Sequence, residues 1–137
     1  MTEVLFVCVH NAGRSQMAEA FFNHLARERG LAAVGVSAGT APREAINPVA
    51  VEAMAELGIG LEGQTPKHIT AEQANRAERV ITMGCGVQAE MCPAGTFISD
   101  DWGLDDPMGK SIEGVRRVRD QIEERVRALI DELEGPR

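Results

Sequence analysis

The sequence predicts an α/β fold in which a central four-stranded parallel sheet is flanked by helices on both faces. Short apolar segments at 3–8, 32–37 and 79–83 alternate with segments whose apolar residues recur at helical spacing. Strands that are apolar on both faces are typical of parallel sheets covered by helices on each side. A chain of 137 residues is the usual size of one such unit, so we expect a single domain over residues 1–137.

The first half of the chain is predicted to form a strand, a helix, a strand and a second helix. Residues 3–8 are short, apolar and β-branched, which favours a buried strand. A helix is expected over 14–29, where apolar residues recur at helical spacing and a glycine follows the last turn. Residues 32–37 predict the second strand, and an Asn-Pro pair opens a helix over 48–57.

The second half is predicted to add two strands and two helices. A threonine caps a short helix over 71–76, and residues 79–83 predict the third strand. The segment 84–95 is irregular or a short helix, and a short fourth strand is expected at 96–98. A serine caps the final helix over 112–133, which carries one apolar stripe.

Composition restricts the partners and the compartment. Fourteen basic and 21 acidic residues give a net charge of −7, which argues against nucleic acid or an anionic membrane as a partner. The longest apolar run has only six residues, Val4 to Val9, and the N-terminus is acidic where a targeting signal would be basic. Three cysteines without a secretory signal indicate a reducing compartment, so we expect a cytoplasmic protein.

The segment from Cys8 to Ser15 joins a predicted buried strand to the N-terminus of a predicted helix. Such a loop binds anions through backbone N–H groups and the helix dipole, and Arg14 can form a bidentate contact with a tetrahedral oxyanion. The same field favours the thiolate of Cys8, which is the nucleophilic form. The alternative is that Cys8 is an inert core cysteine. An arginine six residues later and a serine seven residues later make this interpretation less favoured than a nucleophile. The residues expected to bind the oxyanion are Val9, His10, Asn11, Ala12, Gly13, Arg14 and Ser15.

Cys-x5-Arg-Ser followed by Gln16-Met17-Ala18-Glu19 resembles the low-molecular-weight protein tyrosine phosphatase family, and more closely the arsenate reductases built on that fold. The likeness extends in order over essentially the whole chain. It continues in Ser37-Ala38-Gly39, Asn47-Pro48, Gln64-Thr65, Val80-Ile81-Thr82, Cys85-x6-Cys92-Pro93 and Trp102-Gly103-Leu104-Asp105-Asp106-Pro107.

The resemblance implies an enzyme that reduces arsenate to arsenite by a relay of three cysteines, without a cofactor. Cys8 would attack arsenic while Asp106, directly before a proline, protonates the leaving oxygen. Cys85 would then attack Cys8, and Cys92 would move the disulfide to Cys85–Cys92, which thioredoxin reduces. Phosphate and sulfate would compete with arsenate for the same loop. Considered apart from this resemblance, the Asp-Asp-Pro sequence that contains Asp106 would more often be a solvated turn.

The residues themselves leave the pairing of Cys85 with Cys92 open. On a helix the two would lie about 10.5 Å apart along the axis, whereas a disulfide needs Cα atoms within about 7 Å. A disulfide therefore requires the segment to rearrange, which its flanking glycines allow. Two unrelated core cysteines remain the alternative, and a zinc site fits the spacing poorly, so no metal is predicted.

Some members of the family hold a potassium ion near the anion loop with Asn, Glu, Ser and Asp oxygens. Asn11, Glu19 and Ser37 match three of these positions, but Lys67 stands at the fourth. We expect the ammonium of Lys67 to pair with Glu19 in place of the ion, so no potassium is expected; a surface lysine is the alternative.

Three other functions compete with the thioredoxin-linked reductase. A tyrosine phosphatase on the same fold would hydrolyse a phospho-cysteine, but the aromatic residues expected after Asp-Pro are replaced by Met108 and Gly109. A reductase of the mycothiol type would use a small thiol instead of thioredoxin. A silent oxyanion or metal sensor would need no acid, so the set of Cys8, Arg14 and Asp106 argues against it.

Overall fold

The computed structural model describes residues 1–83 and 98–135, which build one parallel sheet with helices packed on both faces. The strands are β1 (Thr2–Cys8), β2 (Ala33–Gly39), β3 (Arg79–Thr82) and β4 (Asp100–Asp101). The helices are α1 (Arg14–Glu28), α2 (Pro48–Ala55), α3 (Ala71–Arg76) and α4 (Ile112–Glu134).

The four strands lie in the order β2-β1-β3-β4, and every neighbouring pair is parallel. β1 is therefore central, with β2 paired along its whole length from Thr2↔Ala33 to Cys8↔Gly39. Parallel strands bring their carboxyl ends to one edge of the sheet, where ligands of α/β proteins usually bind. Cys8 stands at that edge, beside the last residues of β2 and β3.

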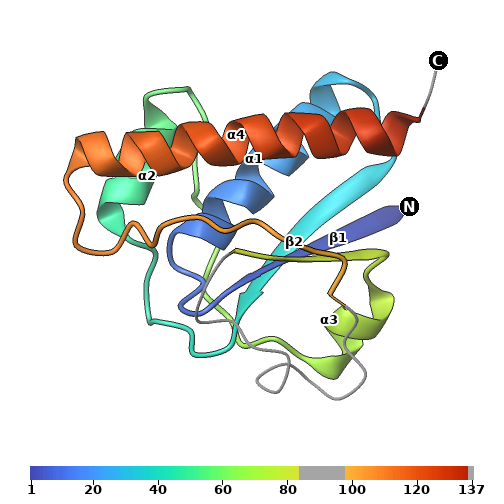
Figure 1. The fold of residues 1–137 in the computed structure, drawn as a ribbon, viewed down its shortest axis with the longest axis horizontal. Coiled ribbons are helices and arrows are strands. Elements are labelled where there is room, and N and C mark those ends of the chain that lie inside the picture. The colour runs from blue at the N-terminus through green and yellow to red at the C-terminus, as the bar shows by residue number, and fades with distance from the viewer. Residues whose placement is uncertain (84–97, 136–137) are drawn as a thin grey trace.

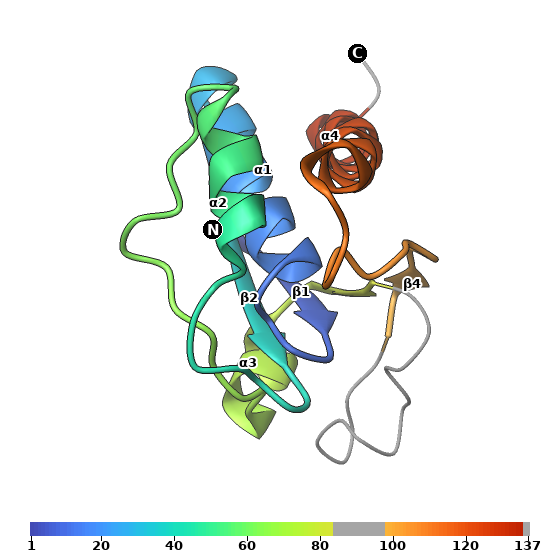
Figure 2. The same cartoon turned by 90° about the vertical axis from the view of Figure 1, so that its left-hand side faces the viewer.

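Within the described residues, three helices cover one face of the sheet and one short helix covers the other. Figure 1 shows α1, α2 and α4 together on one side of the strands, with α3 on the opposite side, and Figure 2 shows the same layers end on. On the first face Val4 and Phe6 of β1 pack in the main core with residues of α1 and α4. On the second face Leu5 and Val7 pack with Val80, so β1 is apolar on both sides, as expected for a central parallel strand.

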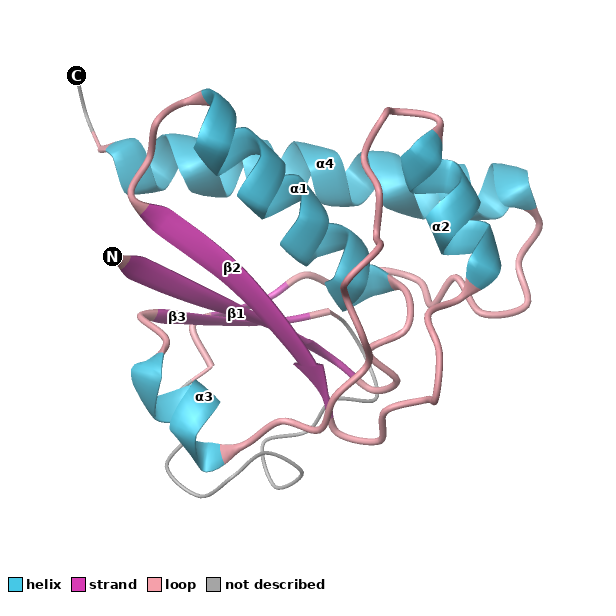
Figure 3. Ribbon diagram, turned by 180° about the vertical axis from the view of Figure 1, so that it is seen from behind, coloured by secondary structure: helices cyan, strands magenta, loops and turns pink. Residues whose placement is uncertain are grey.

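Local sequence explains where the helices begin. The side chain of Asn47 accepts a hydrogen bond from Val49 N at the start of α2, with a proline at the first helical position. Thr70 and Gln73 form a reciprocal capping box at α3, and the Ser111 side chain accepts from Gly114 N at α4. The helices shown in Figure 3 therefore confirm the predicted fold class and helix positions to within a few residues.

The fourth strand was predicted at the wrong place. We expected it at 96–98, but the strand is Asp100–Asp101, paired with Ile81 and Thr82 of β3; positions 96 and 97 lie outside the described residues. β4 is at the edge of the sheet, and both of its residues are exposed. Short, charged edge strands resist pairing with other chains, so such a strand does not show the apolar pattern used to find it.

Candidate active site

The loop after β1 holds the sulfur of Cys8 by hydrogen bonds from its own residues. Cys8 is 2% exposed, Ser15 Oγ lies 2.9 Å from its Sγ, and Asn11 N donates to the same sulfur at 3.2 Å. Gly13 precedes the first residue of α1, so the loop ends at a helix N-terminus. Donors that converge beside the positive end of a helix form a site suited to binding an anion.

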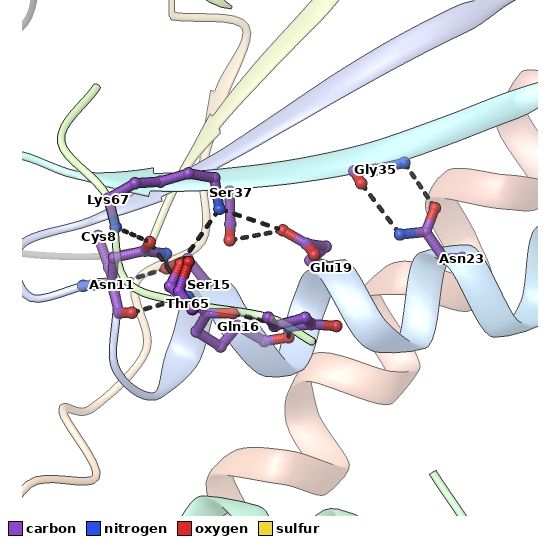
Figure 4. A network of polar contacts seen from close by, with 11 residues as sticks. Cys8, Asn11, Ser15, Gln16, Glu19, Asn23, Gly35, Ser37, Thr65 and Lys67 are labelled. Atoms are coloured by element: carbon purple, nitrogen blue, oxygen red, sulfur yellow. Dashed lines mark hydrogen bonds and ion pairs between the residues drawn. The ribbon is translucent and has the colours of Figure 1, made fainter. Parts of the chain in front are cut away.

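Asn11 stabilises the shape of this loop from its buried side. It is fully buried and has a φ of 49°, the left-handed conformation that asparagine tolerates better than most residues. Its Nδ2 donates to Ser15 Oγ at 2.7 Å, and its Oδ1 accepts from Lys67 N at 2.9 Å. Figure 4 shows these contacts joining the loop to the segment that carries Lys67.

Two glutamines extend this support to the loop before α3. Gln16 is fully buried, and its Nε2 donates to both Asn11 O and Asn11 Oδ1, at 2.9 and 3.1 Å. Gln64 Nε2 in turn donates to Gln16 Oε1 at 2.7 Å. Because each buried amide has partners, the network rigidifies the loop instead of leaving polar groups unsatisfied.

Arg14 is held in place by two carbonyl groups. Its Nη1 donates to Met83 O at 2.7 Å and to Leu104 O at 3.1 Å, and the residue is 4% exposed. These bonds connect α1 to the end of β3 and to the segment that follows β4. The guanidinium is therefore aimed before any oxyanion arrives, which limits the entropy lost on binding.

Asp106 reaches the same place from the segment between β4 and α4. That segment is anchored by Trp102, which is buried and packs on Phe6 with ring centroids 5.7 Å apart. Asp106 Oδ1 accepts Met108 N at 2.9 Å, whereas Asp106 Oδ2 lies 3.8 Å from both Arg14 Nη2 and His10 Nδ1.

These groups line one pocket with a volume of about 300 Å³. Cys8, His10, Arg14 and Asp106 line it with polar groups, while Ile46 and Met108 add apolar surface. Arg43 also lines the pocket, and its guanidinium contacts the Met108 sulfur.

Two glycines allow the loops to approach one another. A Cβ on Gly13 would lie 2.7 Å from Pro107 Cγ, so the anion loop and the segment bearing Asp106 meet only because position 13 lacks a side chain. A Cβ on Gly39 would lie 2.6 Å from Val9 O. Both positions are sterically closed to larger residues.

Lys67 and Glu19 meet beside the loop, as the sequence predicted. Lys67 Nζ lies 3.9 Å from Glu19 Oε1, and Ser37 Oγ donates to the same oxygen at 2.7 Å. Burial raises the pKa of Glu19 above its ordinary value, and the hydrogen bond from Ser37 and the charge of Lys67 offset part of that rise.

The structure brings together three of the five predicted catalytic residues, Cys8, Arg14 and Asp106. Cys85 and Cys92 lie outside the described residues. Of the predicted oxyanion-binding residues, His10, Ala12 and Gly13 line the pocket with Arg14, whereas Asn11 and Ser15 are buried behind it and Val9 is absent from the lining.

Sequence reasoning missed the pocket residues Arg43, Ile46 and Met108 and the approach of His10 to Asp106. No motif marks Arg43, since it lies in a loop with no regular pattern. The histidine at the third position of Cys-x5-Arg was visible, but only the fold reveals what it faces.

Among residues 1–83 and 98–135, no three His, Cys, Asp or Glu side chains gather closely enough to hold a metal ion. No helix in the same ranges has the length and apolar character needed to cross a membrane.

Curated relatives share this sequence over nearly its whole length. A protein of Halobacterium salinarum with a provisional arsenate reductase name is 40% identical over 134 residues, which cover 96% of this chain and 93% of the relative. The glutaredoxin arsenate reductase of a Synechocystis species is 38% identical over 134 residues, covering 97% and 99% of the two chains.

Solved structures share the fold. An arsenate reductase in the phosphate-binding state aligns with a TM-score of 0.82 at 37% identity, covering 96% of this chain and 98% of the other. A thioredoxin-dependent arsenate reductase of Corynebacterium glutamicum aligns with a TM-score of 0.79 at 34% identity, covering 98% of this chain and 62% of the other.

The family model described as low molecular weight phosphotyrosine protein phosphatase matches residues 3–136. The match includes the strand, the anion loop and the segment bearing Asp106. With the fold, the geometry of the Cys8 loop and the relatives above, it shows that this chain belongs to the low molecular weight phosphotyrosine protein phosphatase family.

Proposed function

We propose that this protein reduces arsenate to arsenite through a thiol relay that starts at Cys8. The observation that carries the proposal is one pocket in which the Cys8 sulfur, the Arg14 guanidinium and the Asp106 carboxyl converge. A nucleophile, an oxyanion clamp and an acid are the groups that displacement at a tetrahedral oxyanion needs. The relatives named arsenate reductase supply the substrate class.

In the first step arsenate occupies the loop, with Arg14 and the loop N–H groups on its oxygens. The thiolate of Cys8 forms a bond to arsenic and displaces one hydroxide. The hydroxide takes a proton from the carboxyl group of Asp106 and leaves as water. Arsenic is still As(V) at this stage, since thiolate and hydroxide exchange without electron transfer.

In the second step the thiolate of Cys85 attacks the Cys8 sulfur. The S–As bond breaks, its electron pair stays on arsenic, and arsenite leaves as As(III) while Cys8 and Cys85 become a disulfide. Cys92 then attacks Cys85, which frees Cys8 and forms Cys85–Cys92. Thioredoxin would reduce that disulfide, and no cofactor is required.

The remaining features of the proposal follow from the same chemistry. The chain 1–137 would act as one domain, because the anion loop and both distal cysteines belong to one catalytic cycle. Three working thiols require a reducing compartment, which favours the cytoplasm. Phosphate and sulfate would compete for the loop, since both are tetrahedral oxyanions.

Phosphate-ester hydrolysis is the second candidate, because the family is named for it and the pocket suits a phosphoryl group. We propose it as a weak side activity that uses Cys8, Arg14 and Asp106 alone. The residues after Asp106 are a proline, Met108 and Gly109, so no aromatic ring follows to grip a phosphotyrosine.

The test is turnover of arsenate with thioredoxin, thioredoxin reductase and NADPH, compared with glutaredoxin plus glutathione and with mycothiol. We expect arsenite formation to match NADPH oxidation one to one in the thioredoxin system. Turnover only with a small thiol or glutaredoxin would support the arsenate reductase activity and reject thioredoxin as the electron donor. No arsenite in any system would reject the proposal.

A further inference from the structure

His10 places an imidazole directly against the acid of the pocket. Its Nδ1 lies 3.8 Å from Asp106 Oδ2, and the two side chains are 28% and 42% exposed. The backbone of His10 is held by a hydrogen bond from Arg43 N to His10 O at 3.0 Å. A small rotation of either side chain closes the gap to a hydrogen bond, and such bonds often tighten only when substrate is bound.

The two oxygens of Asp106 are used differently. Oδ1 is occupied by the N–H of Met108, whereas Oδ2 faces His10 and Arg14. Oδ2 is thus the oxygen that can exchange a proton with a neighbour, and Arg14 does not give up its proton in proteins. Of the two basic side chains that the described residues place within 4.0 Å of Oδ2, His10 and Arg14, only the imidazole can exchange a proton near neutral pH.

The chemistry of the first step makes this contact useful. The acid must hold a proton when the leaving oxygen departs, but an aspartate side chain is ordinarily ionised at neutral pH. Imidazole exchanges its proton near neutral pH. A carboxylate paired with a protonated imidazole therefore keeps a transferable proton where the carboxylate alone would not.

We propose that His10 supplies the proton that Asp106 delivers to the leaving oxygen, a role that builds on the proposed function. As the S–As or S–P bond forms, the proton of His10 Nδ1 passes to Asp106 Oδ2, and the carboxyl so formed delivers a proton to the departing oxygen. Asp106 ends the step as a carboxylate and His10 as a neutral imidazole. Solvent reprotonates the imidazole. In this proposal the imidazole of His10 acts on the reacting atoms only through Asp106, so His10 is a positioning and proton-supplying residue.

The other charged or titratable side chains that line the pocket with His10 and Asp106 are Arg14 from α1, Arg43 from the loop after β2, and Cys8 at the end of β1. The two guanidiniums can contact a bound oxyanion but do not give up a proton. Cys8 is the proposed nucleophile, so His10 is left to supply the proton.

The test measures single-turnover formation of phospho-Cys8 with aryl phosphates whose leaving groups differ in basicity. A basic leaving group such as phenolate needs protonation, whereas p-nitrophenolate needs it little. We expect His10→Gln to lower the rate with phenyl phosphate at pH 7 by about tenfold or more, and with p-nitrophenyl phosphate by less than about threefold. The loss should shrink as the pH is lowered, because solvent then protonates the carboxyl without the imidazole.

Two comparisons separate this role from others. His24→Gln is the matched control, since His24 Nε2 lies 3.5 Å from Glu28 Oε1 in an exposed pair on α1, and it should leave both rates unchanged. In an Asp106→Asn background, His10→Gln should have no further effect if the proton passes through Asp106. A role in oxyanion binding would instead weaken inorganic phosphate binding and slow both esters alike.

Equal losses with both esters, or a further loss in the Asp106→Asn background, would overturn the inference. So would absence of phosphoryl transfer in the wild type. The expected pattern without arsenate reduction would reject the proposed function and keep the His10 role. Arsenate reduction together with equal losses for the two esters would keep the proposed function and reject the His10 role.

Discussion

Arg14 combines charge and shape in a way that a point charge cannot reproduce. Its planar guanidinium donates to two carbonyls, Met83 O and Leu104 O, with Nη1 while Nη2 faces the pocket. Arg14→Lys keeps the charge but loses the fork, so we expect phosphate and arsenate to bind about tenfold more weakly or worse, as measured by calorimetry. Unchanged affinity would contradict the oxyanion clamp.

Cys8 is the nucleophile that both proposed activities need. Cys8→Ser keeps the size of the side chain and its contacts with Ser15 and Asn11, but an alcohol is a far weaker nucleophile than a thiolate. We expect arsenate reduction and phosphatase activity both to fall below detection, while circular dichroism shows a folded protein. Activity on either substrate would show that another group is the nucleophile.

At this scale the sequence predicts the chemistry better than the geometry. Cys-x5-Arg-Ser identifies Cys8 and Arg14 because the spacing itself encodes a loop that returns to a helix N-terminus. The contact between His10 and Asp106 joins positions 96 residues apart, and Arg43 enters the pocket from an irregular loop. Such contacts depend on tertiary packing, which local patterns do not record.

The ends of β1 and β2 must approach closely for the anion loop to adopt its shape. Gly39→Ala would place a Cβ 2.6 Å from Val9 O. Because this neighbour is a backbone atom, the loop itself would have to shift to relieve the clash. We expect a loss of about 1–3 kcal/mol in unfolding free energy and at least a tenfold loss of phosphate affinity, because the loop must shift.

Gly103→Ala is the matched control for that experiment. Nothing lies within 4 Å of the added Cβ, so unfolding and binding should stay close to wild type. If Gly39→Ala behaved like Gly103→Ala in denaturant titration and calorimetry, the close approach would not support the loop.

Helices α2 and α4 are joined by an ion cluster. Glu56 accepts hydrogen bonds from Arg116 and Arg119, which lower its pKa to about 2. Because the folded pKa lies below the ordinary value near 4.5, this contribution to stability is present above that value and is lost as the pH falls from about 4.5 to 2.

Glu56→Gln should therefore lower the melting temperature at pH 7, and the difference from wild type should vanish near pH 2. Thermal unfolding followed by circular dichroism measures this. Glu124→Gln, on the exposed side of α4, should show no such pH-dependent difference. A difference that persists unchanged to pH 2 would mean that the ion cluster is not its origin.

The fold is largely predictable at the scale of elements because its signals are local. The apolar runs of β1, β2 and β3 and the caps of the helices each depend on a few adjacent residues. The predicted position of β4 was displaced because Asp100 and Asp101 are charged and exposed, so the strand lacks the apolar signal by which strands are recognised.

The whole molecule carries a net charge of −7, yet its pocket is built to bind an anion. Arg14, Arg43 and the N-terminus of α1 create a local positive field against the overall charge. Association with oxyanions should thus depend on the pocket and not on the surface as a whole.

The proposed reduction of arsenate depends on three cysteines that act in order. Cys85→Ser should permit the first attack by Cys8 but abolish repeated turnover with thioredoxin, because no thiol then releases arsenite. Phosphatase side activity should persist in this variant, since hydrolysis uses only Cys8, Arg14 and Asp106. Full thioredoxin-linked turnover would exclude Cys85 from the relay.

The most direct test of that order is peptide mass spectrometry of Cys92→Ser after one exposure to arsenate, with free thiols blocked by acid quench and alkylation. Without Cys92 the relay should stop with Cys8 and Cys85 joined, so we predict a peptide pair cross-linked through Cys8–Cys85 and one equivalent of arsenite. The wild type treated in the same way should yield Cys85–Cys92. If Cys92→Ser instead showed no Cys8–Cys85 cross-link and kept full turnover with thioredoxin, the three-cysteine relay would be wrong.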